Sequence, residues 1–353
     1  MANDTRGVFR LRSLRQENVE GKGVNVDDVW VPHAPTNLTD YGYWTEGRLA
    51  SGYTSTTERT TFTTDTTETL PSSPHPTADY VGQSLTSLTD FYTAGGWDAQ
   101  TRVYKMSYSN ESWSLNPGSQ NMVREQRESG TGVGPKTAGY IFMGDDPNYH
   151  GAQHSSVQKV VYSVDVWSQL PNFPYAATYG LSFGNQTKAI VGGGNKPSVT
   201  SQAYKFTYAT ETYGGEQYLV PNNSGPGSGE RSETASTGNA ELAWVALGRM
   251  PHGMTSTMFK YTFATDTAAA TNNKLSRSRR WPKAAGNTSA GYFAGGDSPA
   301  PTYTTMDKLN FSTDTGTYTP GANLSVGRSR FFGSSPRMNG LGASTSPGIP
   351  PYR

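Results

Sequence analysis

Cysteine, a charge excess of either sign and long apolar runs are all absent from this chain. Without cysteine, neither disulfides nor cysteine-ligated zinc can hold the fold together. With 29 basic and 28 acidic residues, the formal net charge is +1, so no global field attracts nucleic acid or an anionic membrane. No apolar run approaches the roughly 20 residues that a membrane-spanning helix needs. The first residues, Met1–Arg6, contain no apolar stretch, so we expect no secretory signal.

Hydrophobic residues are also scarce, at 33% of the sequence, a value that a disordered chain could share. Disordered chains are poor in aromatic residues, however, whereas aromatics make up 12% of this sequence. Its 40 glycines and 21 tyrosines, with threonine-rich stretches between them, are typical of short strands joined by tight turns. The composition therefore predicts an all-β protein.

One short apolar segment ending in glycine recurs about every 49 residues. Its six copies are Gly42–Gly47, Phe91–Gly96, Gly139–Gly144, Ala189–Gly194, Ala243–Gly248 and Gly291–Gly296. Alignment on Gly95 leaves a one-residue ambiguity between Met143 and Gly144, and we take Gly144 as the equivalent. Each copy predicts a short buried strand that ends in a glycine turn.

A second pattern follows each of these segments: a basic residue, an aromatic residue three positions later and an acid three positions after that. The six triplets are Arg59/Phe62/Asp65, Lys105/Tyr108/Glu111, Lys159/Tyr162/Asp165, Lys205/Tyr208/Glu211, Lys260/Phe263/Asp266 and Lys308/Phe311/Asp314. We expect each carboxylate to accept backbone N–H groups in its turn and each basic residue to pair nearby. A sixfold pattern indicates a structural role, because a catalytic site needs a unique set of groups.

Two independent patterns at one period indicate tandem repeats, each with room for the four strands of a propeller blade. A solenoid would need distinct polar end repeats, whereas the terminal repeats here resemble the middle ones. We therefore predict a six-bladed kelch-like β-propeller with an extended N-terminal arm. The predicted parts are an arm (1–40), the propeller (41–335, with repeats near 42–90, 91–138, 139–188, 189–240, 241–290 and 291–335) and a tail (336–353).

The first strand of each blade is expected to come from the end of the preceding repeat. The corresponding segment after the sixth repeat, Arg328–Ser334, has no seventh repeat to follow it. Left alone, it would expose Phe331, Phe332 and an unpaired strand edge. We predict that it completes the first blade beside Gly42–Trp44, with Val29–Val31 as the alternative donor.

The double glycine at this period resembles the kelch family, and Tyr108/Trp113 and Tyr162/Trp167 approach that family's Tyr–Trp spacing, although four repeats lack the tryptophan. The sequences of Gly291–Asp297 and Met306–Thr315 are more similar to the kelch-like repeats of marine bacteriophage virion proteins, especially those of cyanophages. The segments Arg6–Leu14 and Asp27–Val31 resemble the leader of those proteins. This resemblance implies a structural virion protein of a tail, baseplate or fibre, present in multiple copies.

In the arm, Phe9–Leu14 alternates apolar and polar residues among clustered arginines, as a strand added to the sheet edge of another virion protein would. Its candidate anchoring residues are Phe9, Arg10, Leu11, Arg12, Leu14 and Trp30. The alternative is an arm that folds back on the propeller or stays without structure. The tail, rich in proline and glycine, is expected to make a second, smaller contact.

The loops between the glycine segment and the basic–aromatic segment should emerge on one face of the ring. They carry the candidate ligand-contacting residues Trp97, Asp98, Arg102, Asp145, Asp146, Tyr149, His150, Asn195, Lys196, Arg249, Asp297 and Tyr303. Aromatic rings beside carboxylates and amides suit sugars, so host-surface glycans are the expected ligands, with Trp97 and Tyr149 as the main contacts. The alternative is a set of solvated loop tips.

No metal, cofactor or catalytic activity is expected. His150, His154 and His252 lie near Asp145 and Asp146 in the loops, but on two blades and without a recognised ligand spacing. Ser312–Tyr318 resembles the Asp-box turn of sialidases, which are also six-bladed, yet no arginine triad or Tyr/Glu pair can be assigned. Galactose-oxidase-like chemistry needs a cysteine. A virion component and a free glycan-binding propeller remain as functions, and a sialidase-like hydrolase is a weaker third.

Overall fold

The computed structural model describes residues 40–97, 101–116, 121–124, 132–145, 153–196, 198–218, 231–251, 253–298 and 301–341. The chain divides into two compact units, Met1–Asn37 and Leu38–Arg353, and every described residue belongs to the second. The predicted anchoring residues of the arm, Phe9 to Trp30, lie outside the described residues.

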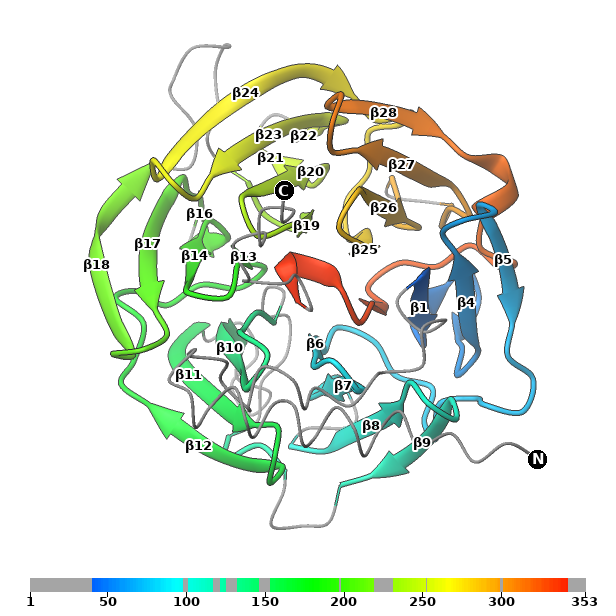
Figure 1. Cartoon of the computed structure of the whole chain (residues 1–353), viewed down its shortest axis with the longest axis horizontal. Coiled ribbons are helices and arrows are strands. Elements are labelled where there is room, and N and C mark those ends of the chain that lie inside the picture. The colour runs from blue at the N-terminus through cyan, green and yellow to red at the C-terminus, as the bar shows by residue number, and fades with distance from the viewer. Residues whose placement is uncertain are drawn as a thin grey trace, which may run out of the picture. The chain divides into compact units, whose positions relative to one another are not determined.

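Six antiparallel sheets radiate from a common centre in the second unit, and each forms one blade of a propeller (Figure 1). From the inside outward, blade 1 contains β29 (Phe332–Ser334), β1 (Tyr41–Thr45), β4 (Thr57–Thr61) and β5 (Thr66–Thr69), and blade 2 contains β6 (Gln83–Thr86), β7 (Asp90–Ala94), β8 (Val103–Ser107) and β9 (Ser112–Leu115). Blade 3 contains β10 (Ala138–Asp145), β11 (Gln153–Val161) and β12 (Val166–Leu170), and blade 4 contains β13 (Leu181–Gly184), β14 (Lys188–Gly192), β17 (Gln202–Thr207) and β18 (Thr212–Tyr218). Blade 5 contains β19 (Ala235–Gly238), β20 (Leu242–Ala246), β23 (Thr257–Thr262) and β24 (Thr267–Lys274), and blade 6 contains β25 (Lys283–Gly286), β26 (Ala290–Ala294), β27 (Met306–Asn310) and β28 (Thr315–Tyr318).

A few shorter elements lie outside these strands. In blade 3 an isolated bridge between Val133 and Tyr140 stands where the other blades have a first strand. The loops carry three small hairpins, β2 (Arg48–Leu49) with β3 (Gly52–Tyr53), β15 (Asn195–Lys196) with β16 (Ser198–Val199), and β21 (Arg249–Met250) with β22 (Gly253–Met254). Two 3₁₀ turns, η4 (Pro320–Ala322) and η5 (Met338–Gly340), complete the described elements.

The ring closes as the sequence predicts, with the last strand of the array supplying the first strand of blade 1. β29 pairs antiparallel with β1, with Trp44 opposite Gly333 and Thr45 opposite Phe332. Phe331 and Phe332, which would be exposed in an open array, are 0% and 1% exposed here. The first and last repeats therefore share one sheet.

Near the end of each second strand stands a residue with positive φ, followed by a glycine. The first residue is not always glycine: Glu46, Met143 and Leu247 adopt φ values of 56°, 59° and 64° at this position. Met143, and not Gly144, is therefore the equivalent of Gly95, which corrects the alignment chosen from the sequence. The second position is glycine throughout, and the close approach of the chain explains why: a Cβ on Gly47 would lie 2.6 Å from that of Phe331.

The basic–acid pairs of the sixfold triplet join neighbouring blades. The pairs are Arg59 with Glu111 (2.6 Å), Lys105 with Asp165 (2.5 Å), Lys159 with Glu211 (2.5 Å), Lys205 with Asp266 (2.9 Å), Lys260 with Asp314, and Lys308 with Asp65 (2.9 Å). The expectation that each carboxylate would accept backbone N–H groups in its own turn is wrong. An ammonium or guanidinium group from the preceding blade gives a stronger, charge-assisted bond.

Aromatic rings stack across the same blade junctions. The stacked pairs are Tyr43–Tyr108, Tyr92–Tyr162, Tyr140–Tyr208, Trp244–Phe311 and Phe62–Tyr292, with ring centroids between 4.3 and 5.3 Å apart. In each pair, one ring lies on the second strand of its blade (Tyr43, Tyr92, Tyr140, Trp244 and Tyr292), and the other is the aromatic residue of a triplet in the next blade. Blade 4 has Ile190 at this position, and there Lys188 adds a second bond to Asp266. The ion pairs and stacked rings of the triplets thus hold neighbouring blades together.

Candidate functional site

The loops that follow the second strands share one face of the propeller with the linkers that precede the first strands. Isolated backbone bridges join the two sets: Arg48 with Ser329, Thr178 with Asn195, Ser232 with Arg249, and Arg280 with Asp297. We call this side the loop face. It is the face on which the sequence placed the candidate ligand contacts.

A chain of backbone hydrogen bonds runs around the central channel at the loop face. Its members each precede a first strand and have φ between 52° and 64°: Val81, Arg330, Trp281, Glu233 and Tyr179. The amide of each donates to the carbonyl of the next, at 2.9, 3.3, 2.9 and 3.2 Å. We call these residues the channel-mouth ring; among the described residues it links five of the six blades directly.

Two guanidinium groups enclose the indole of Trp281 in this ring. The Cζ atoms of Arg280 and Arg330 lie 3.8 and 3.6 Å from the ring centroid of Trp281, within the range of a cation–π contact. Arg280 also donates through Nε to Asp297, 3.0 Å away. The buried Asp297 thereby fixes one cation against the indole.

Glu233 is the acidic member of the channel-mouth ring. The residue is 5% exposed, and Oε2 has no hydrogen-bond partner among the described residues. The nearest cation is Arg280, whose Nη1 lies 3.8 Å away, too far for a hydrogen bond. Burial raises the pKa of Glu233 to about 7, against the lowering effect of the surrounding arginines. Near neutral pH this carboxyl is therefore partly protonated and able to donate.

Three stacked aromatic rings lie on the loop face where blades 1 and 2 meet. Tyr53 stacks on Tyr80 with centroids 4.7 Å apart and an interplanar angle of 10°. Tyr80 stacks in turn on Trp97 at 5.6 Å and 17°. Tyr80 is buried, whereas Tyr53 is 49% exposed, so the outer ring of this aromatic stack is open to solvent.

A pocket of about 350 Å³ opens on the same face, across the ring from the aromatic stack, where blades 4 and 5 meet. Hairpins of the two blades and the linker between them supply its lining residues, which are Asn195, Ser198, Val199, Ser232, Glu233, Arg249 and Pro251. The pocket thus brings together Asn195 and Arg249, two of the residues that the sequence put forward, with the buried carboxyl of Glu233.

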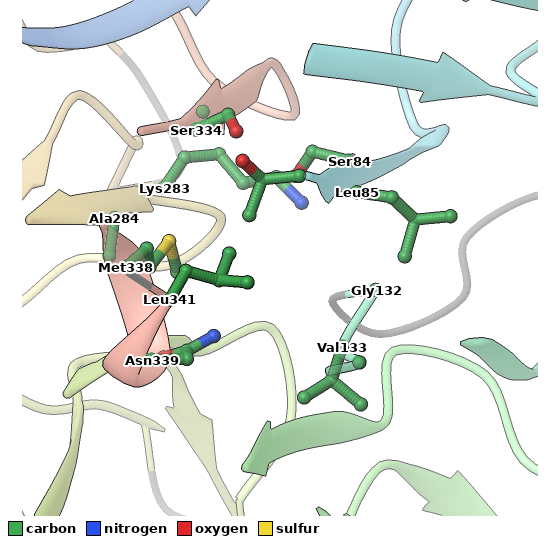
Figure 2. Close-up of a pocket in the computed structure, with 13 residues that line it drawn as sticks. Ser84, Leu85, Gly132, Val133, Lys283, Ala284, Ser334, Met338, Asn339 and Leu341 are labelled. Carbon is green, nitrogen blue, oxygen red and sulfur yellow. The ribbon is translucent and has the colours of Figure 1, made fainter. Parts of the chain in front are cut away.

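The channel itself is filled from the side opposite the loop face. Figure 2 shows Lys283 reaching into a small cavity that Met338, Asn339 and Leu341 close on one side. The cavity measures about 20 Å³, which is room for one water molecule. Burial lowers the pKa of Lys283 to about 8. The described part of the predicted tail, residues 336–341, therefore lies against its own propeller.

Of the other predicted contacts, some fall among the described residues. Arg102 is exposed, Asp145 is half-buried at the end of β10, Asp297 pairs with Arg280, and Tyr303 lies beneath Arg277 with 5.1 Å between Cζ and the ring centroid. Lys196 belongs to β15. Asp98, Asp146, Tyr149 and His150 lie outside the described residues.

Sequence reasoning missed the linker residues Tyr80, Glu233, Trp281 and Arg330. A signal for the last three was present: Arg231, Arg279 and Arg328 recur at the repeat period, each two residues before a member of the channel-mouth ring. These arginines are themselves buried, and two of them form fully buried ion pairs, Arg279 with Asp307 and Arg328 with Glu58. In blades 5, 6 and 1 this buried cation marks where the linker turns into its blade.

Two negative findings apply to the described residues. They contain no group of three or more histidine or acidic side chains that would hold a metal ion. His154, weighed as a ligand from the sequence, is buried and shares a hydrogen bond with Ser156 at 2.8 Å. Across the same residues, no helix has the length and apolar character that crossing a membrane requires.

Comparison with known proteins identifies the fold. No protein-family model and no curated protein matches the chain. Among solved structures 633 chains match, so the architecture is widely used and does not point to one activity. One of them, "Structure of YjhT", is 16% identical with a TM-score of 0.56, over 73% of this chain and 88% of that chain. This likeness establishes a six-bladed propeller of the kelch-like type.

Proposed function

We propose that this kelch-like propeller is a non-enzymatic component of a bacteriophage virion and that its loop face binds glycans of a host surface. The observation that carries the binding role is the aromatic stack of Tyr53, Tyr80 and Trp97. The half-exposed ring of Tyr53, held in place by Tyr80 behind it, offers a flat surface on which the apolar face of a sugar can stack.

The geometry of the stack favours a sugar over a peptide strand. The inner rings hold Tyr53 in one orientation, so little side-chain entropy is lost when a ligand packs on it. Burial and a hydrogen bond with Tyr53 raise the pKa of Tyr80, and that hydrogen bond ties the hydroxyl edges of the two stacked rings together. A flat ring with hydroxyl groups at its rim matches a pyranose, which has an apolar face and a polar edge.

The virion role rests on the resemblance of the repeats and of the leader to cyanophage virion proteins. The propeller supports this role in one respect. The two ends of the repeat array meet in blade 1, so a rigid ring can be displayed from a single attachment. The sixfold basic–acid pairs are engaged between blades, which supports a structural use of these charges. A free glycan-binding propeller would use the same stack but needs no anchoring arm.

A glycan array tests the binding role. We expect the wild-type chain to bind a restricted set of glycans and the variant Tyr53→Ala/Trp97→Ala to lose at least tenfold in affinity, because aromatic anchors dominate such contacts. The matched control is Tyr318→Ala, which removes a tyrosine of equal exposure (50%) from the outer strand β28. Equal binding by the double variant and the control would refute the role of the stack.

Mass spectrometry of purified phage particles tests the virion role separately. The protein should be present in the particle at a fixed ratio to other structural proteins. Its absence from particles, together with glycan binding by the free chain, would leave the free glycan-binding propeller as the function.

A further inference from the structure

The pocket between blades 4 and 5 combines hydrogen-bonding groups with a small apolar surface. Its polar lining residues are Asn195, Ser198, Ser232, Glu233 and Arg249, and its apolar lining residues are Val199 and Pro251. We propose that this pocket is a second ligand site of the loop face and that it binds a single sugar residue.

The size of the pocket sets the first limit on the ligand. Sites for small molecules usually measure about 300–1,000 Å³, and this pocket, at about 350 Å³, is at the lower end. One pyranose ring fits such a volume, whereas a longer oligosaccharide or a peptide would have to leave most of its length outside. The ligand is therefore a terminal or free monosaccharide.

The polar lining sets the second limit. Serine hydroxyls both donate and accept, the asparagine amide does so through separate atoms, and arginine only donates. Glu233 contributes a carboxyl that is 5% exposed and whose Oε2 has no hydrogen-bond partner among the described residues. Because Oε2 is shielded from solvent, Glu233 contacts a ligand only through the part of the residue that lines the pocket. Adjacent hydroxyls of a sugar, which donate and accept in turn, complement this set.

The charge around the pocket argues against a phosphate or another multivalent anion. Of the three arginines near Glu233, Arg280 is held by Asp297 at 3.0 Å and Arg330 lies over Trp281, which leaves Arg249 on the rim. Glu233 itself becomes negative above neutral pH and would repel an anion placed beside it. A neutral ring, or one with a single carboxylate directed at Arg249, is compatible with both residues.

The pocket walls are fixed before any ligand arrives. Thr178 and Asn195 exchange backbone hydrogen bonds of 3.2 and 2.8 Å, which hold the hairpin of blade 4 to its linker. Ser232 and Arg249 do the same in blade 5, at 3.0 and 2.8 Å. Preformed walls lower the ordering cost of binding, as is typical of small-molecule sites.

This site is independent of the proposed role of the aromatic stack, which lies three blades away at the junction of blades 1 and 2. Saturation-transfer NMR with a panel of glucose, galactose, mannose, N-acetylglucosamine and glucuronate provides the test, with the full chain at pH 6.5. We expect one or more sugars to bind, and Arg249→Ala and Glu233→Gln each to weaken binding at least tenfold.

The matched control is Glu241→Gln, which changes an exposed glutamate in the same blade, in the turn between β19 and β20 on the opposite face. It should bind like the wild type. Because Arg249 is exposed, its variant tests the pocket even if Glu233→Gln fails to fold. The proposal is overturned if no sugar of the panel binds, or if binding persists in both pocket variants. Loss only in Tyr53→Ala/Trp97→Ala would also overturn it while leaving the proposed function intact.

Discussion

Lys308 of blade 6 donates to both carboxylate oxygens of Asp65 in blade 1, with 2.9 Å between Nζ and each oxygen. Five equivalent pairs join the other neighbouring blades, but this one spans the two ends of the repeat array. It therefore belongs to the closure of the ring together with the pairing of β29 and β1. Each side chain is about 30% exposed, so water screens the pair only in part.

A double-mutant cycle of Asp65→Asn and Lys308→Met measures this contact. We expect a coupling free energy of about 0.5–1 kcal/mol in urea unfolding, typical of a half-exposed ion pair. Glu68→Gln is the control, because Glu68 is 57% exposed and pairs with Arg59 within one blade. A coupling of zero would mean that closure depends on the strands alone.

Removal of the closure strand's apolar contacts should cost far more. Phe332 is 1% exposed and packs with Tyr43, Phe91 and Tyr108. We expect Phe332→Ala to lower the free energy of unfolding by about 3–5 kcal/mol, the usual loss for a buried phenylalanine. Deletion from Arg328 onward should be worse still, because it also removes Phe331 and leaves Glu58 buried without its ion-pair partner. Stability equal to that of Tyr318→Ala would contradict the closure.

Glu233 makes stability depend on pH. Its folded-state pKa is about 7 because of burial, against 4.5 as the ordinary value. Between these values the unfolded chain has released the proton while the folded chain still holds it, so stability falls as pH rises from 4.5 to 7. Glu233→Gln should match the wild type near pH 4.5 and exceed its stability at pH 8 by on the order of 2 kcal/mol.

Thermal melts of Glu233→Gln and the exposed control Glu241→Gln, taken from pH 4.5 to 8, check this prediction. A constant difference across that range, or the same profile in both variants, would show that Glu233 is ionised in the folded chain throughout.

The arm is expected to serve assembly and not folding. A chain that starts at Asn37, the end of the first compact unit, should stay soluble, rich in β-structure and cooperative on melting, yet fail to enter phage particles. Circular dichroism and mass spectrometry of particles are the two measurements. Aggregation of the shortened chain would show that the arm belongs to the folded core.

The repeat was readable from the sequence because both of its motifs are local. Each glycine segment and each triplet occupies a few consecutive residues, and their period gave six blades, the loop face and the closure by Arg328–Ser334. The partners across blade junctions were not readable. Lys105, for example, pairs with Asp165 of the next blade, and only the ring geometry brings residues 60 positions apart together.

The candidate site was predicted only in part for a similar reason. The sequence identified Asn195, Arg249, Asp297 and Trp97 because they stand in the variable loops. Glu233, Trp281 and Arg330 stand in linkers that read as the start of the next strand, and their positive φ values are set by the hydrogen bonds of the channel-mouth ring. Such bonds join different blades, so no local pattern indicates them.

Hydrogen–deuterium exchange of the chain with its best glycan from the array tests most directly whether the loop face is the binding surface. We predict slower exchange in the loop-face segments 46–56, 79–82 and 95–97, which carry the aromatic stack. The turns on the opposite face, 87–90 and 287–290, should exchange at the same rate with and without glycan. Protection of those turns, or of the outer strands, with no change around Tyr53 and Trp97 would contradict the account.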